Sequence, residues 1–503
     1  MAGGSGSAPE KDCGELTGCR KLKREIQAYV KKADQWIKDH QKEFIEEIQG
    51  LARIPSVSHP EEAAENAPFG PACRSVLDRA LERGRAYGFD TEDLAGYAGV
   101  ISMGDRRNAI GLIAHLDVVP VGDGWIYPPF GATYLPEHDA LIGRGVDDNK
   151  GSAVMALFVM RMLREWGAPL RHGIALYCGT SEENGMHDMK ALRERGHVFP
   201  KLSLVPDAGF PVNYGQKGSL NGFIQAKAIG NLLSFDGGSA HNVVPDRAEC
   251  VIDAEEAAVQ AALQKLPDGL RGKITAGKTP EGVRLTAAGQ SGHAAFPDGG
   301  VNAIAVLAAA LVSSNLLTGA AAKAIAGLYA LTRDNHGCSE GVFYEDELSG
   351  PLTLVYTIAH LKDGVLRVGL DCRYPITCPG GKLRSSLIEA WKALGYTPED
   401  LQLSDPYYIP KESPYVAALQ QVYHSLTGSG EPPYTMGGGT YSKAVPNAVS
   451  FGPGVKGPSR VRAFLPEGHG SAHGRDEALP MEKVYNCARI YVAALLTLDE
   501  ILD

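Results

Sequence analysis

The sequence predicts an α/β fold in which a domain with a mixed sheet and helices on both faces is interrupted by a smaller α+β domain. From about residue 70 to 215, short apolar runs alternate with amphipathic helical patterns, which is typical of a sheet covered by helices. From about 218 to 408 the strand-like segments are longer and alternate in polarity. Helical periodicity then returns. The first domain is therefore expected to resume after an insertion.

The individual elements follow from local patterns. A long helix is predicted near the N-terminus, with Pro55 just past its end, because apolar residues recur there at helical spacing: Ile26, Val30, Ala33, Ile37, Phe44, Ile48 and Leu51. In the insertion, "KDG" at 362–364 predicts a hairpin turn between two strands. Two helices are predicted after the insertion, in "SPYVAALQQVYHSL" and in the C-terminal segment that follows Pro480.

These patterns set the expected domain boundaries. Residues 1–19 are small and polar, lack the apolar core of a secretory signal, and are expected to form a disordered tail. Residues 20–217 and 409–503 are expected to form the first domain, and residues 218–408 the inserted lid domain. The longest apolar run, at 303–312, is shorter than the ~20 residues that a membrane span needs, so no membrane association is expected.

Composition excludes several classes of function. The formal net charge is −10, from 49 basic and 59 acidic residues, which argues against nucleic acid or an anionic membrane as the partner. The nine cysteines are scattered and contain no C-x-x-C pair. A disulfide framework or a cysteine-ligated zinc is therefore not expected, and the chain is predicted to be cytoplasmic.

Acidic and imidazole side chains follow the predicted strands. "AIGLIAHLDVVP" ends in His115 and Asp117, "GIALYCGTSEENG" in Glu182 and Glu183, and "KLSLVPDAGFP" in Asp207. Ligands of open α/β sheets collect beyond the carboxyl ends of strands, so these groups are expected to converge, together with the acidic pair in "RGVDDNKG" at 144–151. So many carboxylates without offsetting arginines require a strong positive charge, and we expect a divalent metal.

The kinds of side chain narrow the choice of metal. Imidazole and carboxylate without thiolate suit zinc first, with manganese or cobalt as alternatives. His115 and Asp117 lie two residues apart on a strand and so on one face, where the carboxylate of Asp117 is expected to orient the imidazole.

Seven motifs then occur in an order that resembles the dinuclear zinc peptidase family of carboxypeptidase G, aminoacylase and succinyl-diaminopimelate desuccinylase, most closely the branch of bacterial dipeptidase V. They are "HLDVVPVGDGW", "GRGVDDNKG", "GTSEENG", "PDAGFPVNYGQKG", "GHAAFPDGGVNAI", "MGGGTYSKAVPNAVSFG" and "AHGRDEALPMEKV", within roughly residues 40–500. The resemblance implies two metal ions with these ligands: His115 and Asp207 on one, Glu183 and His473 on the other, and Asp148 as the bridge.

The resemblance also implies the remaining roles. Glu182 would be the general acid–base, and His293 of the lid would stabilise the oxyanion. Substrate would be bound by Asn242, by Arg373, and by backbone donors of "GGGTY", which include Gly438 and Gly439. The peptide bond between residues 148 and 149 would be cis. Asn149 departs from close relatives, which often carry Asp there.

The predicted function is hydrolysis of dipeptides with a free C-terminus by a water that bridges two metal ions and is activated by Glu182. Two alternatives remain open: hydrolysis of N-acyl amino acids by the same metal core, and a metal-bound but inactive binding module. Because the insertion is longer than a single lid, the chain is expected to act as a monomer.

Overall fold

The computed structural model describes residues 23–455 and 460–503, so the predicted tail over residues 1–19 lies outside the described residues. The chain divides into two compact units, which are described separately below. Unit 1 comprises residues up to Tyr214, Ile409–Tyr434 and Thr440–Asp503. Unit 2 comprises Gly215–Tyr408 and Thr435–Gly439. The segment 435–439, expected in the first domain, thus belongs to unit 2, and it contains all three glycines of "GGGTY".

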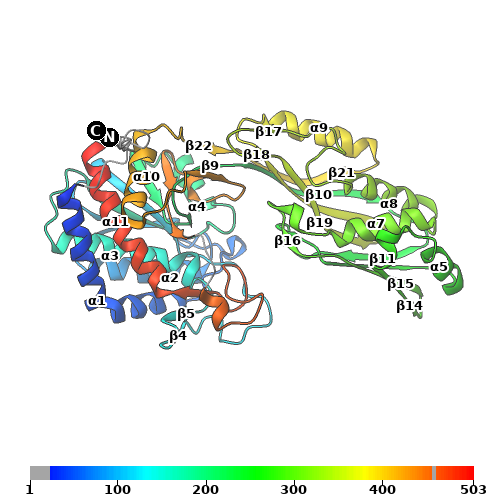
Figure 1. Cartoon of the computed structure of the whole chain (residues 1–503), viewed down its shortest axis with the longest axis horizontal. Helices are drawn as coiled ribbons and strands as arrows, with labels where there is room; N and C mark the ends of the chain where they lie inside the picture. Colours follow the sequence, from blue (N-terminus) through cyan, green and yellow to red (C-terminus); the bar gives the residue numbers. More distant parts are fainter. Residues whose placement is uncertain (1–22, 456–459) are drawn as a thin grey trace, which may run out of the picture. The chain divides into compact units, whose positions relative to one another are not determined.

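Unit 1 is built on a mixed sheet with the strand order β1-β2-β6-β3-β7-β24-β9 (Figure 1). At its centre β3 pairs in parallel with β6 on one side and with β7 on the other. The strands are β1 (Asp90–Asp93), β2 (Ala98–Met103), β3 (Ala109–His115), β6 (Gly173–Gly179), β7 (Leu202–Val205), β24 (Ala448–Ser450) and β9 (Asn213–Gln216). Three short strands form a sheet of their own: β26 (Ala478–Pro480), β5 (Ala140–Ile142) and β4 (Thr133–Leu135). Strands β8 (Ala208–Gly209) and β25 (Pro453–Gly454) form another, and β23 (Tyr434–Met436) pairs with β9.

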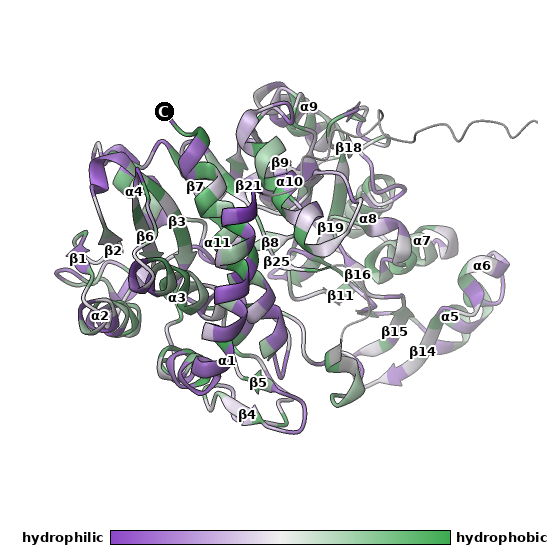
Figure 2. Ribbon diagram, turned by 60° about the vertical axis from the view of Figure 1, so that its left-hand side comes forward, coloured by the Kyte–Doolittle hydropathy of each residue, from purple (hydrophilic) through white to green (hydrophobic). Residues whose placement is uncertain are grey.

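Helices α1, α3 and α11 pack against one another, and α3 packs against β3 and β6 of this sheet. Helix α1 contacts both α3 and α11, and the apolar residues predicted for its buried stripe are all buried. Almost the whole of α3 is buried. Figure 2 shows that α3, like β3 and β6, is mostly hydrophobic. The helices of unit 1 are α1 (Arg24–Ala52), α2 (Pro71–Ala86), α3 (Gly151–Glu165), α4 (His187–Glu194), α10 (Pro414–Thr427) and α11 (Met481–Ile501). The predictions for α1, α10 and α11 are confirmed.

Unit 2 contains an antiparallel sheet with the strand order β14-β15-β13-β11-β19-β20-β10-β21. Helices α7, α8 and α9 pack against it around a separate apolar core. The predicted hairpin is confirmed, since β19 (Thr353–Lys362) turns directly into β20 (Val365–Tyr374). The other strands are β10 (Gly218–Lys227), β11 (Leu232–Gly237), β12 (Val243–Val244), β13 (Arg247–Ile252), β14 (Ile274–Thr279), β15 (Gly282–Ala288), β16 (Gly292–His293), β17 (Glu345–Asp346), β18 (Gly350–Pro351), β21 (Thr397–Ser404) and β22 (Tyr407–Tyr408). The helices are α5 (Glu256–Leu263), α6 (Asp268–Arg271), α7 (Ala303–Ser314), α8 (Gly319–Leu331) and α9 (Gly380–Ala393).

Candidate metal centre

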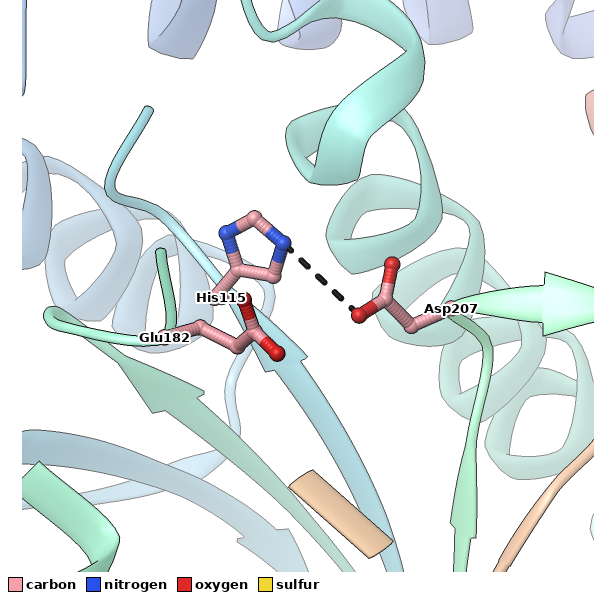
Figure 3. A group of neighbouring side chains, drawn as sticks. All are labelled: His115, Glu182 and Asp207. Atoms are coloured by element: carbon pink, nitrogen blue, oxygen red, sulfur yellow. Dashed lines mark ion pairs between the residues drawn. The ribbon is translucent and has the colours of Figure 1, made fainter. Parts of the chain in front are cut away.

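The carboxyl ends of three parallel strands meet at one edge of the unit 1 sheet. Strand β3 ends at His115, β6 is followed by Glu182 and Glu183, and β7 is followed by Asp207. Because β3 lies between β6 and β7 and runs parallel to both, these side chains emerge at the same edge. Figure 3 shows His115, Glu182 and Asp207 together there, with Asp207 Oδ2 3.9 Å from His115 Nε2.

The acidic pair of "RGVDDNKG" lies at the start of α3 and joins the same cluster. Gly145, with φ 82°, turns the chain into a short π-helical turn, Val146–Lys150. The expected cis peptide bond between Asp148 and Asn149 is present. Asp148 reaches His115, with 3.0 Å between Oδ1 and Nε2, whereas Asp147 forms an ion pair with Lys483 at 2.5 Å. Only the second acid of the pair therefore joins the cluster.

His473 completes the cluster from the loop before β26. Its Nε2 lies 3.1 Å from Asp148 Oδ2 and 2.9 Å from Glu183 Oε1. The nearby His469 instead pairs through Nδ1 with Asp476. Of these two histidines, only His473 contacts the cluster.

Among residues 23–455 and 460–503, two sets of donor atoms could hold a metal ion. His115, Glu182 and Asp207 offer one set, and His115, Asp148 and Glu183 offer another, with the donor atoms of each set within 4.8 Å of one another. The first set includes Glu182, which was expected to be a base and not a ligand. All six residues singled out as ligands or base therefore lie in one cluster, and its imidazole and carboxylate donors fit zinc, manganese or cobalt.

The pKa values of the cluster are shifted by burial and by neighbouring charges. Burial raises the pKa of Glu182 and of Asp207 well above the usual range, and neighbouring carboxylates add to this effect. For His115 burial lowers the pKa, but Asp148 and Asp207 outweigh it and the pKa is raised. Hydrogen bonds to Asp148 and Glu183 raise the pKa of His473 to about 11. Without a cation, the carboxylates therefore favour the protonated form of both imidazoles. A bound metal ion would supply the same positive charge.

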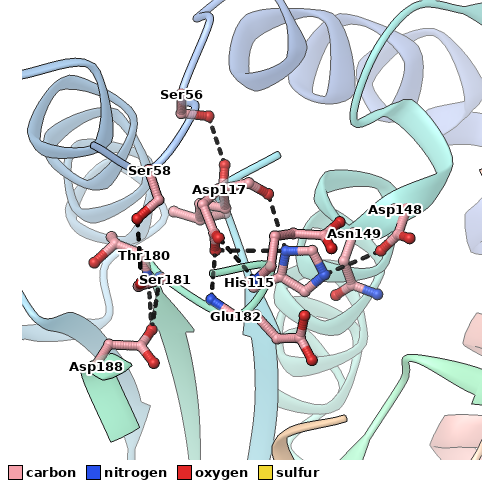
Figure 4. Close-up of polar contacts among 12 residues, drawn as sticks. Ser56, Ser58, His115, Asp117, Asp148, Asn149, Thr180, Ser181, Glu182 and Asp188 are labelled. Carbon is pink, nitrogen blue, oxygen red and sulfur yellow. Dashed lines mark hydrogen bonds and ion pairs between the residues drawn. The ribbon is translucent and has the colours of Figure 1, made fainter. Parts of the chain in front are cut away.

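Two buried aspartates hold the loop that follows β6 (Figure 4). Asp188 accepts the backbone N–H groups of Thr180 and Ser181 at 2.7 and 2.9 Å. Asp117 accepts those of Glu182 and Glu183, both at 3.0 Å. Four consecutive amides are thus bound by two carboxylates, which fixes the backbone that carries the two glutamates.

Asp117 lies against His115 through both its backbone oxygen and its carboxylate. His115 Nδ1 lies 2.9 Å from the backbone oxygen of Asp117, while the carboxylate is 3.6 Å away. The imidazole is therefore oriented by a carbonyl group, because the carboxylate of Asp117 is engaged by the amides of Glu182 and Glu183. Burial raises the pKa of this carboxyl group to about 7.

Asn149, the departure from the expected Asp, also contacts the cluster. Its Nδ2 donates to Asp207 Oδ1 at 3.0 Å and to the Pro206 carbonyl at 2.8 Å. A carboxylate at this position would offer no N–H to Asp207. The substitution therefore supplies a neutral donor that orients one of the expected ligands.

In unit 2, the expected lid residues Asn242 and His293 lie side by side. Strand β12 pairs with β16, which sets Val243 opposite His293, and Ala294 N–H donates to the Asn242 carbonyl at 2.9 Å. The side chain of His293 is exposed, and its Nδ1 accepts the N–H of Ala295 at 3.0 Å.

Arg373 lies next to this ribbon through the "GGG" segment. Its Nη1 donates to the Gly437 carbonyl at 3.3 Å, and a Cβ on Gly437 would lie 3.1 Å from the Cβ of Ala295. Gly438 and Gly439 follow, and a Cβ on Gly438 would meet nothing within 4 Å. We call His293, Asn242, Arg373 and Gly437–Gly439 the lid patch. All of its members belong to unit 2.

The guanidinium of Arg373 is less free than expected. Its Nε and Nη2 both donate at 2.7 Å to the carboxylate of Asp371, two residues earlier on β20. Residues two apart on a strand share a face, so this pairing was foreseeable from the "DCRYP" sequence. The fork that was expected to bind a substrate carboxylate is thus occupied by Asp371, which leaves the Nη1 side facing Gly437.

Several residues of the site were not identified from the sequence. They are Arg144, Asp188, Tyr441, Asp476 and Glu477, all of them buried. Tyr441 donates a hydrogen bond to Asp188, and Asp476 accepts the N–H groups of Ile126 and Tyr127. Arg144, Asp476 and Glu477 each bond backbone groups more than 300 residues away in the sequence. Asp476 and Glu477 follow "HGR" in the last motif, and this acidic pair could have indicated them as site residues. The sequence gives no indication of the groups that they bond.

With this geometry the chain can be placed among known proteins. The model of "Peptidase family M20/M25/M40" matches residues 111–497, and the chain belongs to this family. It is therefore a peptidase.

Particular relatives point the same way. "Putative dipeptidase YtjP" of Bacillus subtilis (strain 168) is 29% identical over 470 residues, covering 91% of this chain and 97% of the relative. A "Putative dipeptidase" of Staphylococcus epidermidis is also 29% identical, covering 92% of this chain and 98% of the relative. Among solved structures, human carnosine dipeptidase 1 is similar with a TM-score of 0.55 and 14% identity, covering 95% of this chain and 100% of that chain. Aminoacylhistidine dipeptidase from Vibrio alginolyticus is similar with a TM-score of 0.52 and 15% identity, covering 90% and 95%. At these identities the structural matches show the fold, which is that of M20 peptidases.

Within the described residues, 23–455 and 460–503, no helix combines the length and the apolar character needed to cross a lipid bilayer.

Proposed function

We propose that the protein is a dinuclear metal-dependent dipeptidase that cleaves short peptides with a free C-terminus. The observation that carries the proposal is the convergence of His115, Asp148, Glu183, Asp207 and His473 on one cluster beside the buried Glu182. This donor set would be self-repelling without cations, and its donor types match zinc, with manganese or cobalt as alternatives. The dipeptidase names of the relatives support the substrate class.

The residues divide into two roles. His115 and Asp207 would hold one ion, Glu183 and His473 the other, and Asp148 would contact both. When bound, a pair of divalent ions lowers the pKa of water and polarises a carbonyl group. Glu182 would accept the proton of the attacking water and deliver it to the leaving amine, a role that suits a carboxyl group whose pKa is raised by burial.

The lid patch would recognise the rest of the substrate. His293 would donate to the oxyanion, Asn242 would bind the peptide backbone, and Arg373 with Gly438 and Gly439 would bind the terminal carboxylate. The contact between Arg373 and Gly437 supports the last assignment, since it places a positive charge beside the backbone that continues into Gly438 and the exposed Gly439. We further propose that the chain works in the cytoplasm as a monomer. Light scattering that showed an obligate dimer, with activity lost on dilution, would contradict the monomer.

The experiment that tests the function is a substrate panel on metal-loaded protein. Free dipeptides, amidated dipeptides, longer peptides and N-acetyl amino acids are compared by kcat/KM. The proposal expects free dipeptides to be the best substrates by a factor of ten or more, since a lost charge-assisted hydrogen bond is worth ~1.5–3 kcal/mol. A preference for N-acetyl amino acids would make the protein an N-acyl amino acid hydrolase. Metal binding without turnover of any of them would make it a binding module.

A further inference from the structure

A buried ion pair contacts the backbone of two loops that carry the cluster, but its side chains are not part of the cluster. Arg144 Nη1 and Glu477 Oε2 are 2.7 Å apart, and their side chains are 1% and 0% exposed. Neither side chain contacts the donor atoms of the cluster in the described contacts. Burying two charges is costly, and such a pair is weak evidence of a contribution to stability. Its contacts with the backbone indicate what it does.

The carboxylate of Glu477 binds the loop that carries Asp148. Its Oε1 accepts the N–H groups of Asp147 and Asp148 at 2.9 and 3.0 Å, and its Oε2 accepts that of Gly145 at 3.1 Å in addition to Arg144. Three amides of one turn thus converge on a single carboxylate. This holds the backbone of Asp148 at a fixed place and leaves its side chain free to face His115 and His473.

The guanidinium of Arg144 binds the loop that carries His473. Its Nη2 donates to the His473 carbonyl at 3.2 Å and to the Pro120 carbonyl at 3.3 Å. His473 has φ 62°, in the left-handed region that a non-glycine residue adopts only when its surroundings enforce it. Arg144 is therefore bonded to the backbone of a residue in an unfavourable conformation, at the point where its ring must face Asp148.

We infer that Arg144 and Glu477 are positioning residues, which together set the separation between Asp148 and His473 and so the affinity for the metal ion at the His473 side. One ion pair ties the two loops: Glu477 holds the amides around Asp148, and Arg144 holds the carbonyl of His473. The side chains that result are 3.1 Å apart, between His473 Nε2 and Asp148 Oδ2. The inference rests on the proposed function, because it takes both residues to be metal ligands.

The first test is Glu477→Gln. The side-chain amide keeps the shape but replaces one acceptor oxygen by an NH₂ group, which faces N–H donors and cannot accept them. Removing a partner that orients a ligand typically lowers metal affinity by about 10–100-fold. We expect the weaker of two stepwise dissociation constants to rise by that factor, measured by competition with a chromophoric chelator, and the metal content after dialysis to fall from two ions towards one.

The matched control is Glu47→Gln. Glu47 is also buried and also pairs with an arginine of unit 1, accepting Arg83 Nε at 2.8 and 3.0 Å between α1 and α2. None of its described contacts involves the cluster. We expect this variant to lose thermal stability while both metal dissociation constants stay at wild-type values.

A second variant keeps the inference testable if Glu477→Gln does not fold. Arg144→Lys retains the buried positive charge, but one ammonium group replaces the two nitrogens that reach Glu477 and the His473 carbonyl. We expect weakened binding at one metal site and a folded protein by near-UV circular dichroism. Wild-type affinity and two bound ions in both variants would overturn the inference and leave the proposed function standing. Wild-type protein that binds no divalent metal would instead overturn the proposed function, and this inference with it.

Discussion

The metal cluster of unit 1 and the lid patch of unit 2 differ in how deeply most of their side chains are buried. In the cluster His115 is 1% exposed and Glu182 8%, and only His473 is exposed, whereas in the lid patch His293 is exposed and Asn242 half-buried. The cluster carries several like charges, and the lid patch carries one guanidinium already paired with Asp371. Crowded like charges need water excluded and a fixed geometry to bind cations, while a patch that meets a substrate can remain solvated.

The two regions also differ in how their backbone is held. Around the cluster, the buried carboxylates of Asp117, Asp188 and Glu477 accept seven backbone N–H groups from the loops that carry the metal-facing side chains. In the lid patch, Asn242 and His293 depend on the two-residue pairing of β12 with β16, whereas Arg373 is held by the carboxylate of Asp371 and contacts Gly437. The loops of the cluster are therefore held by bonds between carboxylates and backbone amides. The lid patch combines local backbone pairing with one side-chain ion pair.

Removal of metal should have the largest effect of the changes considered, and it should alter the cluster loops of unit 1 without altering unit 2. Chelation is expected to reduce activity to background, and zinc, manganese or cobalt to restore it, because the cluster supplies no positive charge of its own beyond protonated imidazole. Hydrogen exchange should show faster exchange of the amides of residues 180–183 in the chelated protein, with β19 and β20 of unit 2 unchanged. Full activity in rigorously metal-free protein would refute the metal assignment.

The next largest effect should distinguish two adjacent glutamates. Glu182→Gln is expected to lower kcat by roughly 10²–10⁴-fold, the usual contribution of a general acid–base, with two ions still bound. Glu183→Gln is expected to lose metal, because Glu183 contacts His473 directly. Metal analysis beside kinetics decides between them. Equal metal loss in both variants would make Glu182 a ligand, as its place beside His115 and Asp207 permits.

In the lid patch, Arg373→Ala should remove the preference for a free carboxylate. Truncating one partner of a buried charge pair costs about 2–5 kcal/mol, or roughly thirtyfold to several thousandfold in kcat/KM. That loss is expected for free dipeptides and not for their amides. Asp371→Asn is the control, since it keeps the guanidinium and removes its present partner. If amides and free dipeptides are equally good substrates of the wild type, Arg373 does not bind the terminal carboxylate.

A smaller effect is expected from Asp188→Asn, which weakens the acceptor of the Thr180 and Ser181 amides without touching the cluster. A loss of about 10–100-fold in kcat/KM is expected, as for groups that orient a ligand. The matched variant in unit 2 is Asp346→Asn, which affects an aspartate that accepts the amides of Ser349 and Thr377. Its kcat/KM should equal the wild-type value. Equal losses of kcat/KM in both variants would show that the bonds from Asp188 to the loop after β6 do not specifically support activity.

The smallest effect concerns a buried carboxyl group of unit 2. Burial raises the pKa of Glu340 to about 7, opposed by a hydrogen bond from Tyr356 at 2.8 Å. The folded state then binds a proton that the unfolded state releases from about pH 4.5, so the stability due to this group is full at low pH and is lost as pH rises to about 7. Urea unfolding of wild type and Glu340→Gln from pH 5 to 8 should show a shallower pH dependence in the variant. Parallel curves would contradict the raised pKa.

Much of the fold followed from local patterns. The stripe of α1, the hairpin turn at 362–364 and the helix after Pro480 depend on residues close in sequence, and all three are present. The convergence of His115, Glu183 and Asp207 could also be predicted, because parallel neighbouring strands present their carboxyl ends at one edge.

Which residue types follow the strands could be read from the chain, and this is why a cation site is expected in unit 1. How these side chains are held depends on the folded molecule. Glu477 is bonded to amides more than 300 residues away, and Asp117 to amides more than 60 residues away. A hydrogen bond depends on the meeting of two groups in space, and local periodicity specifies neither partner. For this reason the sequence predicted Asp117 to orient an imidazole, whereas in the folded chain its carboxylate holds the backbone of the two glutamates.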